Sequence, residues 1–151
     1  LGGSILGNHF HFEPRVKEAL FLNGSFPVSA CIDLSDGLGA DLPRLLEASG
    51  RGVSVDLGKI PVSKEAKTLS KKTLRLPLEH AFHDGEDFEL LFTLPAKFDL
   101  SSSKLWKQKF RTPLTKIGTI TQSREIRCFL GGKAMRLSAS FWKGFDHFKN
   151  V

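Results

Sequence analysis

The sequence has no tyrosine and only two cysteines, although it contains thirteen phenylalanines and two tryptophans. Aromatic surfaces of this chain therefore carry no phenolic hydroxyl. Cys31 and Cys128 show no Cys-x-x-Cys spacing, which gives a zinc site nothing to build on. Each lies in an apolar, strand-like run, so we expect two buried, reduced thiols.

Long apolar runs are also missing. No segment approaches the length of a membrane span, and the first residues lack the basic, apolar and small-residue regions of a signal peptide. We therefore expect a cytoplasmic protein with no membrane partner. Hydrophobic residues form 40% of the chain and charged residues 25%, as in globular proteins, and 151 residues are enough for one domain with its own core.

The charge balance is basic. With 22 Lys and Arg against 16 Asp and Glu, the formal net charge is +6, which suits nucleic acid or small polyanions such as nucleotides. Much of the excess lies between Lys64 and Arg75, a segment without interleaved aromatic residues. A solvated helix face or loop explains this segment better than a nucleic-acid groove, so we expect no nucleic-acid partner.

Several widespread catalytic and nucleotide-binding motifs are absent from the sequence. It contains no Gly-x-Gly-x-x-Gly, no Walker lysine loop, no His-Glu-x-x-His and no nucleophile elbow. Any chemistry with ATP must therefore use a different phosphate-binding arrangement.

Hydrophobic periodicity predicts strands that alternate with helices. We expect helices over residues 12–20, 37–49, 63–72, 78–82 and 101–110, and strands over 28–32, 52–57, 88–94, 114–121, 126–130 and 133–137. The last two strands flank Gly131-Gly132, the clearest hairpin signal in the chain. This order predicts an α/β (α+β) fold, in which helices pack on a mixed β-sheet. We find no internal repeat and no low-complexity linker.

The first group of polar residues follows the strand over 28–32. Asp33, Ser35 and Asp36 precede Gly37, where the next helix begins. Open α/β sheets place ligands at such strand ends, and two carboxylates with a hydroxyl suit Mg²⁺ bound together with phosphate oxygens. Simple capping of the helix by Ser35 or Asp36 explains the same residues, and the spacing alone leaves both interpretations open.

The second group is acidic. Asp84, Glu86 and Asp87 fall within four positions just before the strand over 88–94. Three carboxylates so close together need a cation, a donor-rich ligand or open solvent. A ligand site and a solvated loop rim therefore both remain open.

The third group is aromatic and lies at the carboxy terminus, between Trp142 and Phe148. Rings that flank a glycine can stack on a flat ligand. The alternative is a last hydrophobic anchor of the chain on its own domain, which such residues form more often.

Four short blocks, each present once, span nearly the whole chain in a recognisable order. They are Ala30–Leu38 with its extension to Gly50, then Gly85–Thr93, Lys116–Ile120 and Gly144–Phe148. They resemble the Asp-x-Ser-Asp-Gly-Leu motif, the Gly-Glu-Asp-Tyr-Glu-Leu-Leu-Phe-Thr block, the Ile-Gly-x-Ile strand and the closing Gly-aromatic-x-His-Phe of thiamine-monophosphate kinases. These enzymes belong to the aminoimidazole ribonucleotide synthetase-like superfamily, whose other members do not share this set.

The resemblance implies the fold of the C-terminal domain of that superfamily. Residues 1–151 would be the single C-terminal domain of a two-domain kinase, and the N-terminal ATP-binding domain would be absent from this chain. The implied reaction is the ATP- and Mg²⁺-dependent phosphorylation of thiamine monophosphate to thiamine diphosphate. The full-length protein would be a homodimer, and this half alone would be inactive.

The resemblance also implies roles for individual residues. Asp33 and Asp36 would be Mg²⁺ ligands, and Ser35 would contact ATP. Glu86 and Phe145 would bind the thiamine monophosphate. No covalent catalytic residue is implied, because the phosphoryl group would pass directly between the substrates.

Two departures from the family pattern leave rival interpretations open. Phe88 replaces the usual tyrosine of its block and so loses a hydroxyl. The N-terminal domain, with its own metal-binding aspartates, is missing. A related superfamily enzyme with another substrate, or a solitary domain acting as a non-catalytic ligand-binding or interaction module, remains the alternative.

Overall fold

The computed structural model describes residues 1–7, 10–98, 100 and 103–142. The helices are α1 (Val16–Ser25), α2 (Leu38–Ser49), α3 (Lys64–Ser70), α4 (Pro77–His83) and α5 (Lys104–Lys109). The strands are β1 (Ala30–Asp33), β2 (Gly52–Asp56), β3 (Leu90–Thr93), β4 (Gly118–Thr121), β5 (Ile126–Leu130) and β6 (Lys133–Met135). No helix in this part of the chain is long and apolar enough to cross a membrane.

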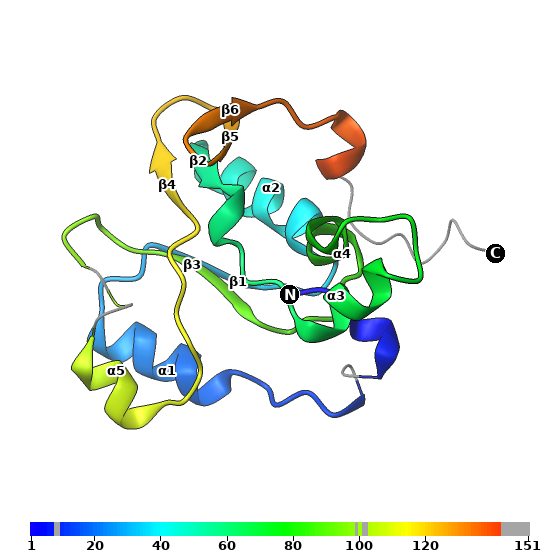
Figure 1. The fold of residues 1–151 in the computed structure, drawn as a ribbon. Coiled ribbons are helices and arrows are strands. Elements are labelled where there is room, and N and C mark those ends of the chain that lie inside the picture. Colours follow the sequence, from blue (N-terminus) through cyan, green and yellow to red (C-terminus); the bar gives the residue numbers. More distant parts are fainter. Residues whose placement is uncertain (8–9, 99, 101–102, 143–151) are drawn as a thin grey trace.

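The strands form two sheets. In the first, β1 pairs antiparallel with β3, with Asp33 opposite Leu90. The second has the order β4-β2-β5-β6, in which β2 and β5 are parallel and the other neighbours are antiparallel. The predicted mixed sheet with packed helices is therefore confirmed, but β1 and β2, which flank α2 in sequence, lie in different sheets (Figure 1).

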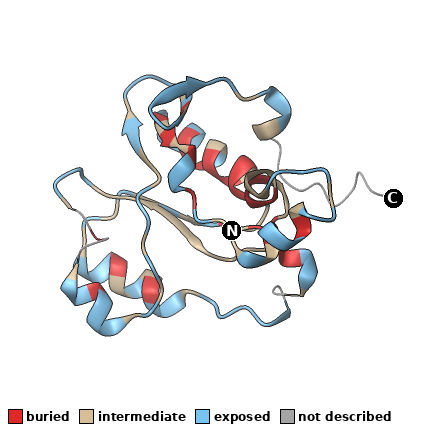
Figure 2. Ribbon diagram, in the orientation of Figure 1, coloured by how far each residue is buried: buried red, intermediate tan, exposed pale blue. Residues whose placement is uncertain are grey.

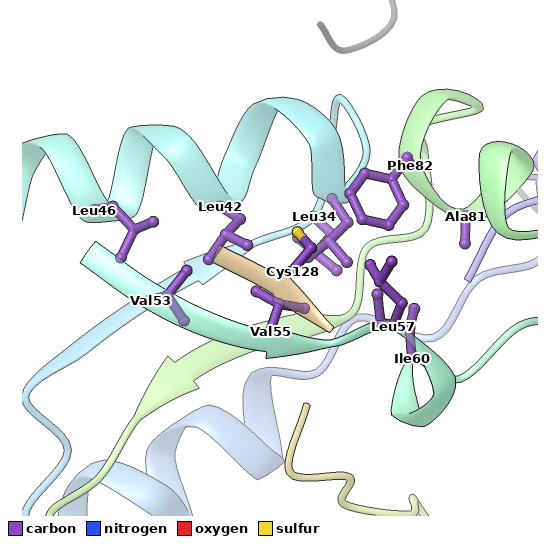
Figure 3. Packing of buried hydrophobic residues seen from close by; sticks show 11 residues of the cluster. Leu34, Leu42, Leu46, Val53, Val55, Leu57, Ile60, Ala81, Phe82 and Cys128 are labelled. Carbon is purple, nitrogen blue, oxygen red and sulfur yellow. The ribbon is translucent and has the colours of Figure 1, made fainter. Parts of the chain in front are cut away.

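The larger hydrophobic cluster lies between α2 and the four-stranded sheet. Leu38, Leu42 and Leu46 recur at helical spacing and are buried along one face of α2. Val53 and Val55 of β2 face that helix, and Figure 3 shows their side chains beneath Leu42 and Leu46. Phe82 of α4 is fully buried at the end of this cluster. This packing holds the end of β1, where the predicted site begins, close to α4.

A second, smaller cluster lies between α1 and α5. Leu22 and Trp106 are buried there, and the indole Nε1 of Trp106 donates a hydrogen bond to the carbonyl of Thr112 at 2.7 Å. Figure 2 colours buried positions on both helices red. Leu90 and Phe92 of β3 pack against this cluster, whereas Leu91 packs against the larger one.

Several predicted boundaries were wrong. The helix expected over residues 12–20 begins only at Val16, after Pro14, and continues through Asn23-Gly24 to Ser25. Only Gly118–Thr121 of the expected strand over 114–121 pairs with a neighbour, because pairing with β2 begins at Gly118. By contrast, α2 and the β5–β6 hairpin have the predicted positions.

The prediction for the cysteines is correct for Cys128 and wrong for Cys31. Both are free, but Cys31 is exposed. It lies in β1, where burial alternates, so that Cys31 and Asp33 are exposed while Ala30 and Ile32 are half-buried. The basic residues between Lys64 and Arg75 are exposed on α3 and the loop after it, as expected.

Candidate functional site

The first and second polar groups of the sequence lie side by side. Beyond the ends of β1 and β3, the two segments remain hydrogen-bonded to each other: the amide of Phe88 donates to the carbonyl of Leu34 at 2.9 Å, and the amide of Glu86 donates to that of Ser35 at 2.7 Å. We call these two segments, residues 33–37 and 84–88, the paired loops. They bring Ser35 next to Glu86 and Asp36 next to Gly85, while Asp33 lies opposite Leu90 at the end of β1.

Close packing of the paired loops depends on two glycines. A Cβ on Gly37 would lie 2.6 Å from the carbonyl oxygen of Phe82, and one on Gly85 would lie 2.9 Å from that of Ser35. Both glycines also have positive φ. Only glycine satisfies both demands without strain, which explains its place in each motif.

Asp36 is held by a network on the first turns of α2. Its carboxylate Oδ2 accepts from Arg44 at 2.5 Å, and its backbone amide donates to Asp41 Oδ2 at 3.0 Å. Asp41 is fully buried and binds Arg44 through its other oxygen at 2.8 Å. The hydrogen bond to Asp36 is the main reason why the pKa of Arg44 is raised. This network fixes the backbone and the carboxylate of Asp36.

The helix-capping interpretation of the first group is not supported. Gly37 occupies the cap position of α2, and no side chain caps that helix. Neither Ser35 nor Asp36 therefore serves the orphan amides of the first turn. The polar side chains at this strand end need another explanation.

Two of the three acids in the second group are engaged inside the protein. Asp84 accepts from the amide of Gly3 at 2.6 Å and contacts Nδ1 of buried His80 at 3.0 Å. Asp87 Oδ1 accepts from the amide of Gly2 at 2.8 Å. A solvated loop rim is therefore wrong for Asp84 and Asp87, because partners more than eighty residues away in sequence cover them.

Burial dominates the electrostatics of Asp87. Loss of solvent raises the pKa of its carboxyl to about 6, although the hydrogen bond from Gly2 lowers it. Its Oδ2 atom is buried, with no hydrogen-bond partner in the described part of the chain. The ionised form of this carboxylate is thus disfavoured in the loop that carries Glu86.

Asp33 and Glu86 differ from these neighbours. Within the described residues, neither carboxylate has a hydrogen bond or an ion pair, and Asp33 is exposed at the end of β1. Of the acids on the paired loops, these two are the ones left available to a ligand.

Comparisons with known proteins identify the family of this chain. Residues 3–131 match the family described as AIR synthase related protein, C-terminal domain. The chain belongs to this family. It is 43% identical over 121 residues to the thiamine-monophosphate kinase of Rhodopirellula baltica, an alignment that covers 80% of this chain and 37% of that protein. With the Escherichia coli K12 thiamine-monophosphate kinase, identity is 33% over 146 residues, covering 95% and 42%.

Solved structures of thiamine-monophosphate kinases are also similar to this chain. A structure of AaThiL complexed with AMPPCP and TMP is similar with a TM-score of 0.63 and 30% identity, over 89% of this chain and 38% of that one. The thiamine-monophosphate kinase of Stenotrophomonas maltophilia K279a gives a TM-score of 0.63 at 30% identity, over 81% and 36%. This AIR synthase related domain therefore spans about two fifths of the length of the relatives it matches.

The domain offers part of a metal site. Hard carboxylate oxygens at a strand end fit Mg²⁺, and Asp33 is free to bind it. The Asp36 carboxylate fits as well, but Arg44 must release it first. The described residues contain no group of three or more His, Cys, Asp or Glu that could hold a metal ion. Further ligands would have to come from phosphate oxygens, water or other parts of a longer protein.

The third sequence group is only partly described. Phe141 and Trp142 pack against Phe82, and their ring centroids lie 4.7 and 5.5 Å, respectively, from that of Phe82. This contact supports the anchor interpretation for Trp142. Phe145, the expected substrate-binding aromatic, lies outside the described residues.

The domain also contains an apolar cavity of about 650 Å³ between the two hydrophobic clusters. Residues of β3 and the segment 112–120 line much of it. It includes none of the predicted site residues, so cavity size does not identify the site here.

Asp41 and Arg44 are functional candidates that motif reasoning did not single out. Asp41 lies in the extension of the first sequence block, between Leu38 and Gly50, and the motif assigned it no role. A carboxylate on the apolar face of a helix, three positions before an arginine, is the signal that could have identified it.

Proposed function

We propose that this domain is part of a thiamine-monophosphate kinase, which transfers the γ-phosphoryl group of ATP to thiamine monophosphate and yields thiamine diphosphate. The main support is the similarity of 80–95% of the chain to curated kinases of that name. The neighbour complexed with AMPPCP, an ATP analogue, and TMP adds to it. Because the domain spans about two fifths of those proteins, the rest of the active site belongs to other parts of a longer, two-domain protein, which we expect to be a cytoplasmic homodimer.

Asp33 and Asp36 would hold Mg²⁺ at the exit of β1. When bound, magnesium would neutralise charge on the phosphates of ATP. Asp33 can bind without rearrangement, whereas Asp36 exchanges its ion pair with Arg44 for the metal. The Arg44 side chain is 55% exposed, so this exchange needs only a change of side-chain conformation.

Ser35 would contact ATP from the same loop. Its carbonyl is already bound by the Glu86 amide, so the backbone is fixed and the hydroxyl remains available for a phosphate oxygen. Positioning of this kind, with charge neutralisation, is the main source of rate in phosphoryl transfer. No covalent residue is needed.

Glu86 and Phe145 would bind thiamine monophosphate. Its thiazolium ring is cationic and flat, so a carboxylate and an aromatic face are complementary to it. The paired loops place Glu86 beside Ser35, so substrate and nucleotide would meet across this loop pair.

The metal assignment is tested with Asp36→Asn in the full-length protein. We expect turnover to fall far more than stability does, because Asn preserves shape but removes the charge that Mg²⁺ needs. Asp56→Asn is the matched control, since Asp56 also pairs with a basic side chain, Lys59, at 3.1 Å. Wild-type turnover of Asp36→Asn at ordinary Mg²⁺ contradicts the ligand role.

The substrate assignment is tested with Glu86→Gln and Phe145→Ala. We expect each to raise KM for thiamine monophosphate about five- to a hundredfold, while KM for ATP barely changes. Glu125→Gln, in the loop before β5, is the control for the same chemical change. If both variants leave KM for thiamine monophosphate unchanged, the assignment is wrong.

The 151-residue chain alone should have no kinase activity, because it supplies only part of the site. Incubation with ATP, Mg²⁺ and thiamine monophosphate tests this through the thiamine diphosphate formed. Turnover above about 1 s⁻¹, an ordinary enzymatic rate, contradicts the proposal that the site is shared with another domain.

A further inference from the structure

The loop that carries Glu86 has an unusual backbone. Glu86 has φ of 53° and Phe88 has φ of 50°, the two non-glycine residues with positive φ in the described chain. Side chains with a Cβ disfavour this region, so the surrounding contacts must hold the loop there. One set of these contacts comes from the other paired loop, where Leu34 and Ser35 accept the amides of Phe88 and Glu86.

The second set comes from the start of the chain. Residues Leu1 to Gly3, which we call the glycine arm, run between α3 and α4. The arm donates its Gly2 amide to Asp87 and its Gly3 amide to Asp84. Residues 84–88 are thus held on one side by Leu34–Ser35 and on the other by the arm.

The arm is itself tightly confined. A Cβ on Gly2 would lie 2.5 Å from the backbone of His80, and one on Gly3 would lie 2.5 Å from the amide of Ala66. The Ser63 hydroxyl donates to the Gly2 carbonyl, and the Ser63 amide donates to Leu1 at 3.0 Å. Because α3 and α4 fix the arm, the arm is a rigid support for whatever binds its amides.

The three acids of the loop therefore differ in what they contact. Asp84 and Asp87 point into the protein and bind the arm, while Glu86 between them has no partner among the described side chains. Glu86 thus lies between two anchored residues, two positions after Asp84 and one before Asp87. Anchoring on both sides restricts the backbone of Glu86 more than either contact alone does.

We propose that Asp84 and Asp87 are positioning residues for Glu86, which fix its loop by binding the amides of Gly2 and Gly3. This inference rests on the proposed substrate-binding role of Glu86. It assigns to the glycine arm a part in substrate recognition, through the backbone and without contact with substrate.

The positioning role is tested first on the 151-residue chain, without substrate. Amide hydrogen exchange of Glu86 and Phe88 should speed up at least tenfold in Asp84→Ala and Asp87→Ala, while amides of β2 keep their protection. Asp84→Asn keeps an acceptor for the Gly3 amide and should restore slow exchange. Asp56→Ala, which removes a 3.2 Å bond from the Gly58 amide, is the matched control and should not affect Glu86.

Unchanged exchange at Glu86 and Phe88 in folded Asp84→Ala and Asp87→Ala overturns the proposal. If Asp84→Ala does not fold, Asp87→Ser decides the matter, because it loses one hydrogen bond only. Equal acceleration throughout the chain also overturns it, since that outcome indicates general destabilisation.

The second measurement uses the full-length protein. Asp87→Ala should raise KM for thiamine monophosphate about three- to thirtyfold with little change in KM for ATP, and Asp84→Asn should stay near wild type. If Glu86→Gln raises this KM but Asp87→Ala does not, the positioning role is wrong and the proposed function stands. If Glu86→Gln has no effect either, the proposed function itself fails.

Discussion

Asp87→Asn removes a buried charge and preserves the shape of the side chain. In the folded domain, burial raises the pKa of Asp87 to about 6, whereas a solvated aspartate in the unfolded chain titrates near 3.8. The ionised form is therefore disfavoured by folding. Because Asn can still accept the Gly2 hydrogen bond, the substitution isolates the contribution of the charge.

The sign and size of the effect follow from these two pKa values. Between about pH 4 and pH 6 the folded domain binds more protons than the unfolded chain, so the stability contributed by Asp87 decreases as pH rises. The decrease is complete above pH 6 and amounts to about 3 kcal/mol, since each tenfold change in an ionisation constant corresponds to about 1.4 kcal/mol. The Asn amide in place of unpartnered Oδ2 costs about 1–2 kcal/mol at every pH.

The quantity to measure is therefore the difference in free energy of unfolding between variant and wild type, as a function of pH. Urea unfolding of the 151-residue chain at pH 4 and pH 7.5 gives both free energies of unfolding. We expect Asp87→Asn to gain about 3 kcal/mol relative to wild type between pH 4 and pH 7.5. Asp56→Asn, at a more exposed carboxylate, is the control and should show a much smaller change. A difference that does not vary with pH refutes the reasoning, because Asp87 would then titrate alike in both states.

Three further substitutions test the packing around the site by urea unfolding. Gly37→Ala should lower the free energy of unfolding by about 2–4 kcal/mol, because a Cβ 2.6 Å from the Phe82 carbonyl and a φ of 90° are both unfavourable; an unchanged midpoint contradicts the close packing. Phe82→Ala should cost about 3–5 kcal/mol for loss of a fully buried ring, and a cost below about 1 kcal/mol disagrees with its burial. Trp106→Phe should cost about 1–3 kcal/mol through loss of its bond to Thr112, and wild-type stability excludes that contribution.

Local patterns predicted those parts of the fold that depend on near neighbours in sequence. The leucines of α2 recur at helical spacing between Gly37 and Gly50, and Gly131-Gly132 connects two strands directly. In both cases the residues that determine the structure lie within a few positions of each other. The helix expected over residues 63–72 is present as α3, and the structure adds that Ser63 caps it, since its hydroxyl accepts the Ala66 amide at 2.8 Å.

The distribution of strands between sheets could not be read from such patterns. Apolar strand-like runs predicted both β1 and β2, but their pairing with β3 and with β4 and β5 depends on contacts between distant segments. The exposure of Cys31 follows from that pairing, because only the completed fold shows which face of β1 remains uncovered.

The candidate site divides in the same way. Motif spacing by itself identified Asp33, Ser35, Asp36 and Glu86 as polar residues at strand ends, because a strand end is a local feature. Which carboxylates are free and which are engaged was decided by the tertiary structure. Asp84 and Asp87 look like Glu86 in sequence, but the amides of Gly2 and Gly3, more than eighty residues away, bind them. A buried charge is tolerated only where a partner is available, and for these two residues folding alone brings that partner into contact.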